Sequence, residues 1–167
     1  MNNQRKTCVL FGLYCLVLLW IVLFKMAFSI EEIRALLTTR SINWIPFSIR
    51  ADGGLFHRRE PVLNVLILIP MGLYFGRFGL KPAKAVALGF GISLGLESCQ
   101  YLFAIGATDV TDLLTNTFGT ALGLLLYAVL RKLYRDKQKA DRFLNAVATT
   151  ALMLFFALIT LLYLSNQ

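Results

Sequence analysis

The chain has 167 residues and a net charge of +8, and 57% of its residues are hydrophobic while only 16% are charged. Soluble domains usually contain about 45–50% apolar and about 25% charged residues, so this composition, with a mean hydropathy of +0.67, indicates an integral membrane protein. The length excludes two substantial domains beside a membrane region, and the charge is typical of cytoplasmic loops near anionic lipid rather than of nucleic-acid binding.

Five stretches are long and apolar enough to cross a bilayer, whose core needs about 20 mostly apolar residues in a helix. They cover about 8–24, 61–78, 83–105, 111–130 and 143–164. The first lacks a small-residue cleavage pattern after Lys25 and is predicted to be an uncleaved anchor. The last contains no charge and is predicted to face lipid. The sequence therefore predicts an all-α, polytopic transmembrane helical bundle that forms one membrane domain over 1–167.

The segment between the first two stretches is too polar to span a membrane. Ser29-Ile30-Glu31-Glu32 has the form of a capping box, and apolar residues recur after it at helical spacing, which predicts an amphipathic helix over 29–41 in the outer interface. The segment 43–47, Asn-Trp-Ile-Pro-Phe, then supplies aromatic side chains typical of an interface belt.

The distribution of Lys and Arg predicts the orientation of the bundle. With the N-terminus in the cytosol, the inner segments hold 11 of these residues and the outer loop holds 5. Cytoplasmic loops carry the excess of positive charge. Five spans with the N-terminus inside and the C-terminus outside satisfy this rule, and 131–142 becomes a basic cytosolic connector.

Polar side chains gather at the outer ends of three stretches, and the cytosolic halves contain nothing comparable. Glu97 and Gln100 share a helix face because they are three positions apart, and Ser93 lies one turn below them. We therefore predict a polar pocket open to the outer leaflet. Its candidate binding residues are Asn64, Glu97, Gln100, Asp109, Asp112 and Asn116 in the spans and Arg50 in the loop above them.

Pairs of glycines four positions apart predict which spans pack most closely. Such small residues let two helices approach at backbone distance. The pairs are Gly72 with Gly76, Gly91 with Gly95 and Gly119 with Gly123. The second, third and fourth spans are therefore the predicted packed core.

Two interpretations of Glu97 remain open at this point. It lies about 12 Å inside its span, where an unpaired carboxylate costs at least about 2.5–3.5 kcal/mol. It is either a structural partner of Gln100, Asn64 or a loop arginine, or a site for a ligand head group, a proton or a cation. Asp109 has the same ambiguity, because it or Thr108 can cap the following helix.

Catalytic and metal-binding patterns are mostly missing from the sequence. It has no H-E-x-x-H, G-x-S-x-G or P-loop motif. Its one histidine, His57, has no second ligand nearby, and the three cysteines lack metal or disulfide spacing. No metal and no cofactor are expected. Glu97 and Asp112 remain the candidates for acid/base catalysis.

Several groups of residues share one family pattern. They are Leu19 to Lys25, Asn43 to Phe47, Asn64 with Ile69 to Gly72, Glu97 with Gln100, and Phe103 to Asp112 followed by Asn116 and Gly119. In these residues the chain resembles the VanZ-like membrane proteins. Where broader members of that family carry an arginine before the first aspartate, this chain has Gly106-Ala107-Thr108.

The resemblance implies a multi-pass bacterial cell-membrane protein linked to low-level resistance to teicoplanin and other lipoglycopeptide antibiotics, with no settled activity or cofactor. Membrane lipids are expected partners, together with a lipoglycopeptide antibiotic or a lipid-linked peptidoglycan precursor. Two function classes remain. One is a non-enzymatic protein that binds or shields an amphiphile, and the other is a small membrane enzyme that modifies an envelope lipid or precursor with Glu97 and Asp112.

Overall fold

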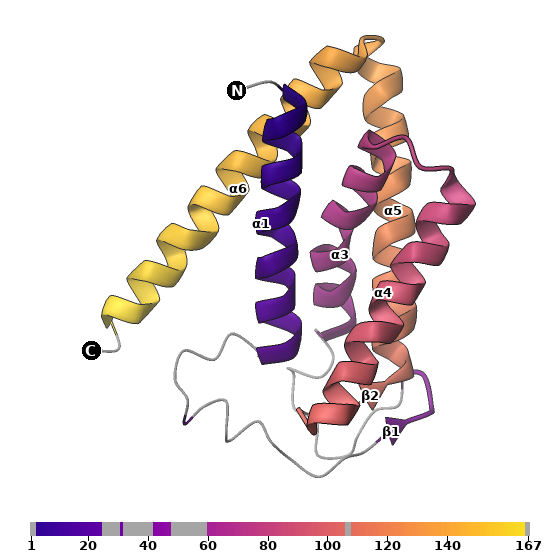
Figure 1. Ribbon diagram of the computed structural model, residues 1–167, viewed down its shortest axis with the longest axis vertical. Coiled ribbons are helices and arrows are strands. Elements are labelled where there is room, and N and C mark those ends of the chain that lie inside the picture. The colour runs from indigo at the N-terminus through magenta and orange to yellow at the C-terminus, as the bar shows by residue number, and fades with distance from the viewer. Residues whose placement is uncertain (1–2, 25–30, 32–41, 48–59, 106–107, 166–167) are drawn as a thin grey trace. The chain divides into compact units, whose positions relative to one another are not determined.

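The computed structural model describes residues 3–24, 31, 42–47, 60–105 and 108–165, in which there are five helices and two short strands (Figure 1). The helices are α1 (Asn3–Phe24), α3 (Glu60–Arg77), α4 (Pro82–Phe103), α5 (Val110–Tyr134) and α6 (Lys137–Ser165). The strands β1 (Ile42–Asn43) and β2 (Thr108–Asp109) pair in parallel. The all-α class is thereby confirmed. Apart from Glu31, the segment 29–41 in which a helix is predicted lies outside the described residues, as do Arg50 and His57.

Four of these helices are long and apolar enough to cross a membrane, namely α1, α4, α5 and α6. The helix α3 is not among them, because its 18 residues include Glu60, Asn64 and Arg77. The predicted first, third, fourth and fifth spans therefore correspond to such helices.

The basic stretch 131–142 is largely helical and not an extended connector. The helix α5 continues to Tyr134 and α6 begins at Lys137, because Lys and Arg are good helix formers and complement the dipole at a helix C-terminus. Arg135, with a φ of 51°, makes the turn. Asp136 then accepts a 2.8 Å hydrogen bond from the backbone N–H of Gln138, which caps the start of α6.

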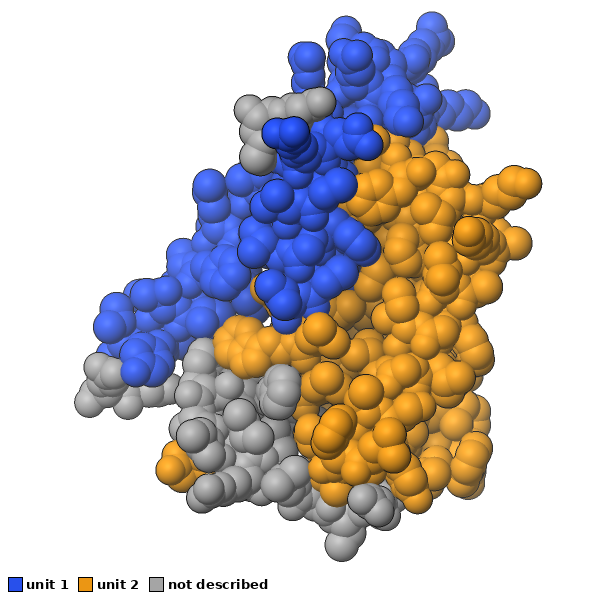
Figure 2. Space-filling view, in the orientation of Figure 1, with its two compact units in different colours: residues 1–16, 130–167 blue, residues 17–129 orange. Residues whose placement is uncertain are grey.

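The chain divides into two compact units, coloured separately in Figure 2. Unit 1 comprises residues 1–16 and 130–167, and unit 2 comprises residues 17–129. All candidate site residues of the described chain belong to unit 2.

Glycines bring α3 and α5 of unit 2 into backbone contact. A Cβ atom placed on Gly123 would meet the Ile69 carbonyl oxygen and would lie 2.9 Å from the Gly72 Cα atom. A Cβ atom on Gly119 would likewise meet the Val65 carbonyl oxygen. The predicted close packing of the second and fourth stretches is therefore confirmed. It leaves no room for a side chain at these positions.

The predicted close packing of the glycine pair in α4, Gly91 with Gly95, was wrong. Cβ atoms on Gly91 and Gly95 would have nothing within 4 Å in the described structure. Gly89 takes their place, since a Cβ atom there would lie 2.7 Å from the Thr120 side chain of α5. The spacing of Gly89 from Ser93 puts both residues on the same helix face, and both are buried.

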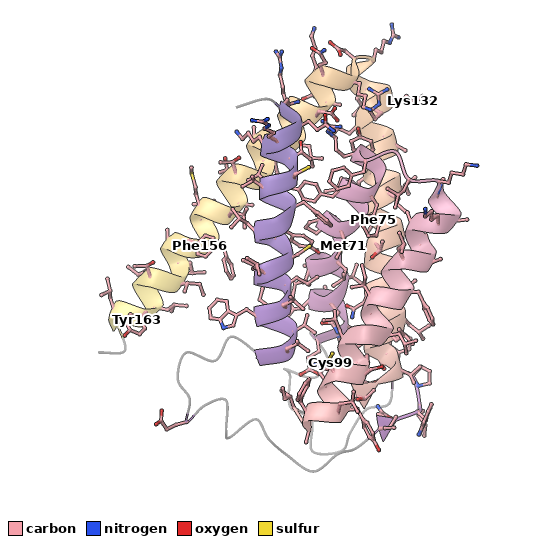
Figure 3. All side chains as sticks on the ribbon, in the orientation of Figure 1. Met71, Phe75, Cys99, Lys132, Phe156 and Tyr163 are labelled. Carbon is pink, nitrogen blue, oxygen red and sulfur yellow. The ribbon has the colours of Figure 1, made fainter. Side chains whose placement is uncertain are left out.

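Burial differs sharply between α3 and α6. Met71 and Phe75 of α3 are only 2% and 7% exposed, whereas Phe156 and Tyr163 of α6 are 46% and 50% exposed (Figure 3). No residue in the most apolar part of α6 is buried. This exposure is what the prediction of a lipid-facing last span requires.

Unit 1 contains a buried polar cluster that was not predicted. The Asn145 side-chain amide donates hydrogen bonds to Asn3 Oδ1 at 2.8 Å and to Thr7 Oγ1 at 3.0 Å. Thr7 Oγ1 donates in turn to the Asn3 carbonyl oxygen at 2.9 Å. Because Thr7 and Asn145 are almost fully buried, these bonds hold the start of α1 to the start of α6.

We expect Asn145→Ala to weaken unit 1, because it removes the hydrogen-bond partner of the buried Thr7 hydroxyl and of the half-buried Asn3 side chain. A buried donor or acceptor left without a partner costs about 1–3 kcal/mol. The measurement is the free energy of unfolding in detergent. Thr160→Ala is the matched control, since this exposed hydroxyl bonds only its own helix at the Phe156 carbonyl. Equal stability of the two variants would contradict a clamp at Asn145.

Candidate functional site

The end of α4 turns the chain back so that β2 lies beside Glu97. Ala104 adopts a left-handed conformation with a φ of 56°, and its N–H bonds back into the last turn of the helix, as is common where helices end. The Ile105 N–H bonds the Gln100 carbonyl oxygen at 2.9 Å. After this reversal the Thr108 hydroxyl donates to the Glu97 carbonyl oxygen at 3.2 Å.

The Glu97 carboxyl group is buried and is held by backbone. Glu97 is 3% exposed, and its Oε2 accepts a hydrogen bond from the Asp109 N–H at 3.1 Å. The predicted structural partners Gln100 and Asn64 are wrong, because both side chains bond elsewhere. A carboxylate that accepts a backbone N–H obtains one of the stronger hydrogen bonds found in proteins.

Asp109 connects three elements through its side chain and backbone. Its Oδ1 accepts the Thr111 N–H at 2.7 Å, which confirms the predicted cap of α5. Its Oδ2 accepts a 2.9 Å hydrogen bond from the Asn43 side-chain amide of β1. Asp109 is therefore a cap and a member of the polar group around Glu97 at the same time.

Two side-chain pairs join α5 to its neighbours within the helical part of unit 2. The Asn64 amide of α3 donates to Asp112 Oδ1 at 2.7 Å. One turn further along α5, the buried Asn116 amide donates to Ser93 Oγ of α4 at 3.0 Å. The predicted polar stripe of α5 thus faces α3 at one level and α4 at the next.

Gln100 lies on the predicted face of α4 but contacts a different helix. Its amide donates to the Val22 carbonyl oxygen of α1 at 3.0 Å. Its side chain is 7% exposed, so it forms a buried cross-link between α4 and the end of α1. A side-chain amide can provide this link because its N–H groups are donors that a helix-end carbonyl oxygen can accept.

The site end of unit 2 is acidic in the described residues. Glu97 interacts electrostatically with the carboxylates of both Asp112 and Asp109. In the described part of this unit, basic residues occur only at the other end, where Arg77 ends α3 and Lys81 and Lys84 flank the start of α4. No group of three His, Cys, Asp or Glu side chains in the described chain is arranged to hold a metal ion.

The structure brings four predicted residues together at one end of unit 2 through the printed contacts, namely Asn64, Glu97, Asp109 and Asp112. Asn43 and Thr108 were not predicted as members of the group. The parallel pairing of Asn43 with Asp109 joins segments 66 residues apart in sequence. In the sequence, the one indication of this pairing was that the segments around Asn43 and Asp109 both belong to the VanZ-like pattern. We define this group, Asn43, Asn64, Glu97, Asp109 and Asp112, as the polar cluster.

Comparison with known proteins identifies the family. The profile of the VanZ/LLP1 family matches residues 11–131, which include every residue of the polar cluster. The protein named Protein VanZ from Enterococcus faecium is 40% identical to this chain over 149 residues, covering 87% of this chain and 87% of that protein. No solved structure matches. By both the profile and the identity to a full-length relative, the chain belongs to the VanZ/LLP1 family.

Proposed function

We propose that this chain is a multi-pass protein of the bacterial cell membrane that gives low-level resistance to teicoplanin and other lipoglycopeptide antibiotics. It acts by binding or shielding an amphiphile at an outer-leaflet pocket around the polar cluster. The observation that carries this proposal is the pair of cross-element contacts, Glu97 with Asp109 and Asn64 with Asp112, at one end of unit 2. Kinship with a protein named VanZ supports the link to resistance.

The free-energy cost of placing carboxyl groups within a membrane supports a binding role for the polar cluster. Ionisable groups within membrane-spanning segments are expensive and therefore mark functional positions by default. Gln100 adds a polar side chain at the same end of α4, Asn116 extends the site one turn further along α5, and Arg50 supplies a positive charge from the loop. The amphiphile is a lipoglycopeptide antibiotic or a lipid-linked peptidoglycan precursor, and no cofactor or nucleic acid takes part.

The proposal includes a membrane arrangement. Five spans cross the bilayer with the N-terminus in the cytosol, and α3 is the span whose polar residues are sheltered by its backbone contact with α5. An interfacial helix over 29–41 lies on the outer side, and residues 1–167 form one membrane domain. Membrane interiors tolerate polar residues on a helix when they face other helices.

The topology predicts the labelling of single cysteines in intact cells. In a variant without the native cysteines Cys8, Cys15 and Cys99, a membrane-impermeant reagent should label only the two outer positions. The four test positions are Asn2, Gly54, Gln138 and Asn166. Labelling at 54 and 166 but not at 2 and 138 is expected. Labelling at Gln138 would overturn the orientation and move the polar cluster to the cytosolic side.

Resistance should depend more on the lipid tail of an antibiotic than on its peptide core. An amphiphile anchored in the outer leaflet meets the polar cluster, whereas a purely water-soluble glycopeptide does not. Each buried methylene contributes about 0.8 kcal/mol. The measurement is the inhibitory concentration of a matched pair, with and without the acyl chain, in cells with and without the protein. If the protein raised the inhibitory concentration of both antibiotics by the same factor, the proposed site would be rejected. A change in the target that the two antibiotics share would then be indicated.

The runner-up function is a small membrane enzyme that uses Glu97 and Asp112 as acid and base. The observation that favours it is the position of both carboxyl groups in the polar cluster, where Glu97 bonds the Asp109 N–H and Asp112, three residues further along the chain, bonds Asn64. Two interacting carboxyl groups can divide the roles of acid and base. A profile of lipids and wall precursors, recorded with and without the protein, tests this function, because a new chemical species is expected only from an enzyme.

A further inference from the structure

The segment Ile42–Phe47 presents large apolar side chains that the polar cluster does not use. Trp44, Ile45 and Phe47 are 73%, 68% and 62% exposed. Single exposed apolar residues are ordinary, but three within four positions make a patch that indicates an interaction surface.

The segment is fixed to unit 2 at both of its ends. Ile42 and Asn43 pair with Thr108 and Asp109 in the parallel sheet. At the other end, the Phe47 N–H donates to Thr111 Oγ1 at 2.9 Å. These bonds fix the backbone of the segment beside the N-terminal end of α5, so the fold itself determines where the exposed side chains lie.

The patch is attached to the ends of two helices that are long and apolar enough to cross a membrane. The strand β1 pairs with β2, which contacts α4 and directly precedes α5. These helices also expose large apolar side chains, since Leu102 and Phe103 of α4 are 63% and 64% exposed and Phe118 of α5 is 61% exposed. Lipid is the environment that covers such helices, and the attachment of the patch to their ends favours lipid as its occupant.

The residue types of the patch also fit one depth in a bilayer. Trp is enriched at the boundary between head groups and acyl chains, because its large apolar ring carries a polar N–H. Ile45 and Phe47 supply purely apolar side chains beside it, as in other segments that lie in the interface. Asn43, directly before Trp44, points its amide at the Asp109 carboxylate instead. The segment thus has an apolar part for lipid and a polar part for the protein.

We propose that Ile42–Phe47 is a membrane-anchored strap, in which Trp44, Ile45 and Phe47 insert into the lipid interface and Asn43 positions Asp109. The Asp109 N–H in turn bonds Glu97, so the lipid surface and the buried carboxyl group are connected by two hydrogen bonds. Asn43 acts here as a positioning residue. This role goes beyond the resistance function and does not depend on which side of the membrane the strap occupies.

Fluorescence of Trp44 tests the insertion directly. The chain has two tryptophans, so Trp20→Phe leaves Trp44 as the only one. In reconstituted vesicles, lipids brominated near the head group should quench its emission more than lipids brominated at the acyl-chain end, and aqueous iodide should quench it weakly. Strong iodide quenching without lipid quenching would overturn the proposal. Loss of lipid quenching as the protein-to-lipid ratio rises would assign the patch to a second copy, and would also overturn it.

A reciprocal exchange tests the positioning role of Asn43. In the Trp20→Phe background, Asn43→Asp places two carboxylates opposite each other and should remove most of the lipid quenching of Trp44. Adding Asp109→Asn restores a donor and an acceptor across the pair and keeps a good helix cap, so quenching should return. The positioning role would be refuted if lipid quenched the Trp44 emission of the Asn43→Asp variant as strongly as that of the parent. It would also be refuted if the double variant folded but its lipid quenching did not return. Neither result depends on whether the cells are resistant.

Discussion

Gly123→Ala is expected to break the contact between α3 and α5 and to cause a large loss of stability for the addition of a single methyl group. The added atom would overlap the Ile69 carbonyl oxygen and would lie 2.9 Å from both the Gly72 Cα atom and the Leu73 nitrogen. These neighbours are backbone atoms and cannot rotate away, so the helices must separate. We expect a cost of about 3 kcal/mol, the upper end of the usual cost of overpacking.

The matched control is Gly91→Ala, at a glycine of α4 whose added methyl would have nothing within 4 Å among the described residues. Alanine forms helix better than glycine by about 1 kcal/mol, so this variant should be as stable as the parent or slightly more so. The measurement is the unfolding temperature of both variants in the same detergent. Similar unfolding temperatures would mean that α3 and α5 are not in backbone contact.

The helices could be predicted from the sequence because their apolar runs are long and end in polar or basic residues. Which glycines face a neighbour was harder to predict. The pair Gly91 and Gly95 has the same spacing as Gly119 and Gly123, but spacing does not say which helix face is buried. Gly89 could have been found from its position one turn before Ser93, which shares a face with Glu97.

The candidate site was predictable in its location but not in its bonds. The distribution of polar residues placed Glu97, Asp112 and Asn64 at one end of the bundle. The partner of Glu97 is a backbone N–H, brought there by the left-handed turn at Ala104, and side-chain patterns carry no information about such partners. The cluster around Asn145 was missed for a related reason, since polar residues near a helix end resemble a solvated connector until a distant Thr7 is found beside them.

Glu97→Ala and Asp112→Ala should each abolish resistance at equal protein level. Alanine at 97 leaves the Asp109 N–H without its acceptor, and alanine at 112 does the same to the Asn64 amide. Lys137→Gln and Lys139→Gln are the controls, because both lysines are exposed at the start of α6, and resistance should persist in them. Full resistance in both alanine variants would remove the polar cluster from the function.

The conservative variants Glu97→Gln and Asp112→Asn separate the two proposed functions. Each keeps a side-chain oxygen that can accept the same hydrogen bond, so the contacts with Asp109 and Asn64 should survive and the protein should fold. A site that binds an amphiphile through hydrogen bonds should then keep part of its resistance, measured as inhibitory concentration against amount of protein in the membrane. Acid/base catalysis should instead be lost completely, because an amide neither supplies nor removes a proton at neutral pH. Complete loss of resistance in a folded Glu97→Gln variant would therefore favour the enzyme over the binding protein.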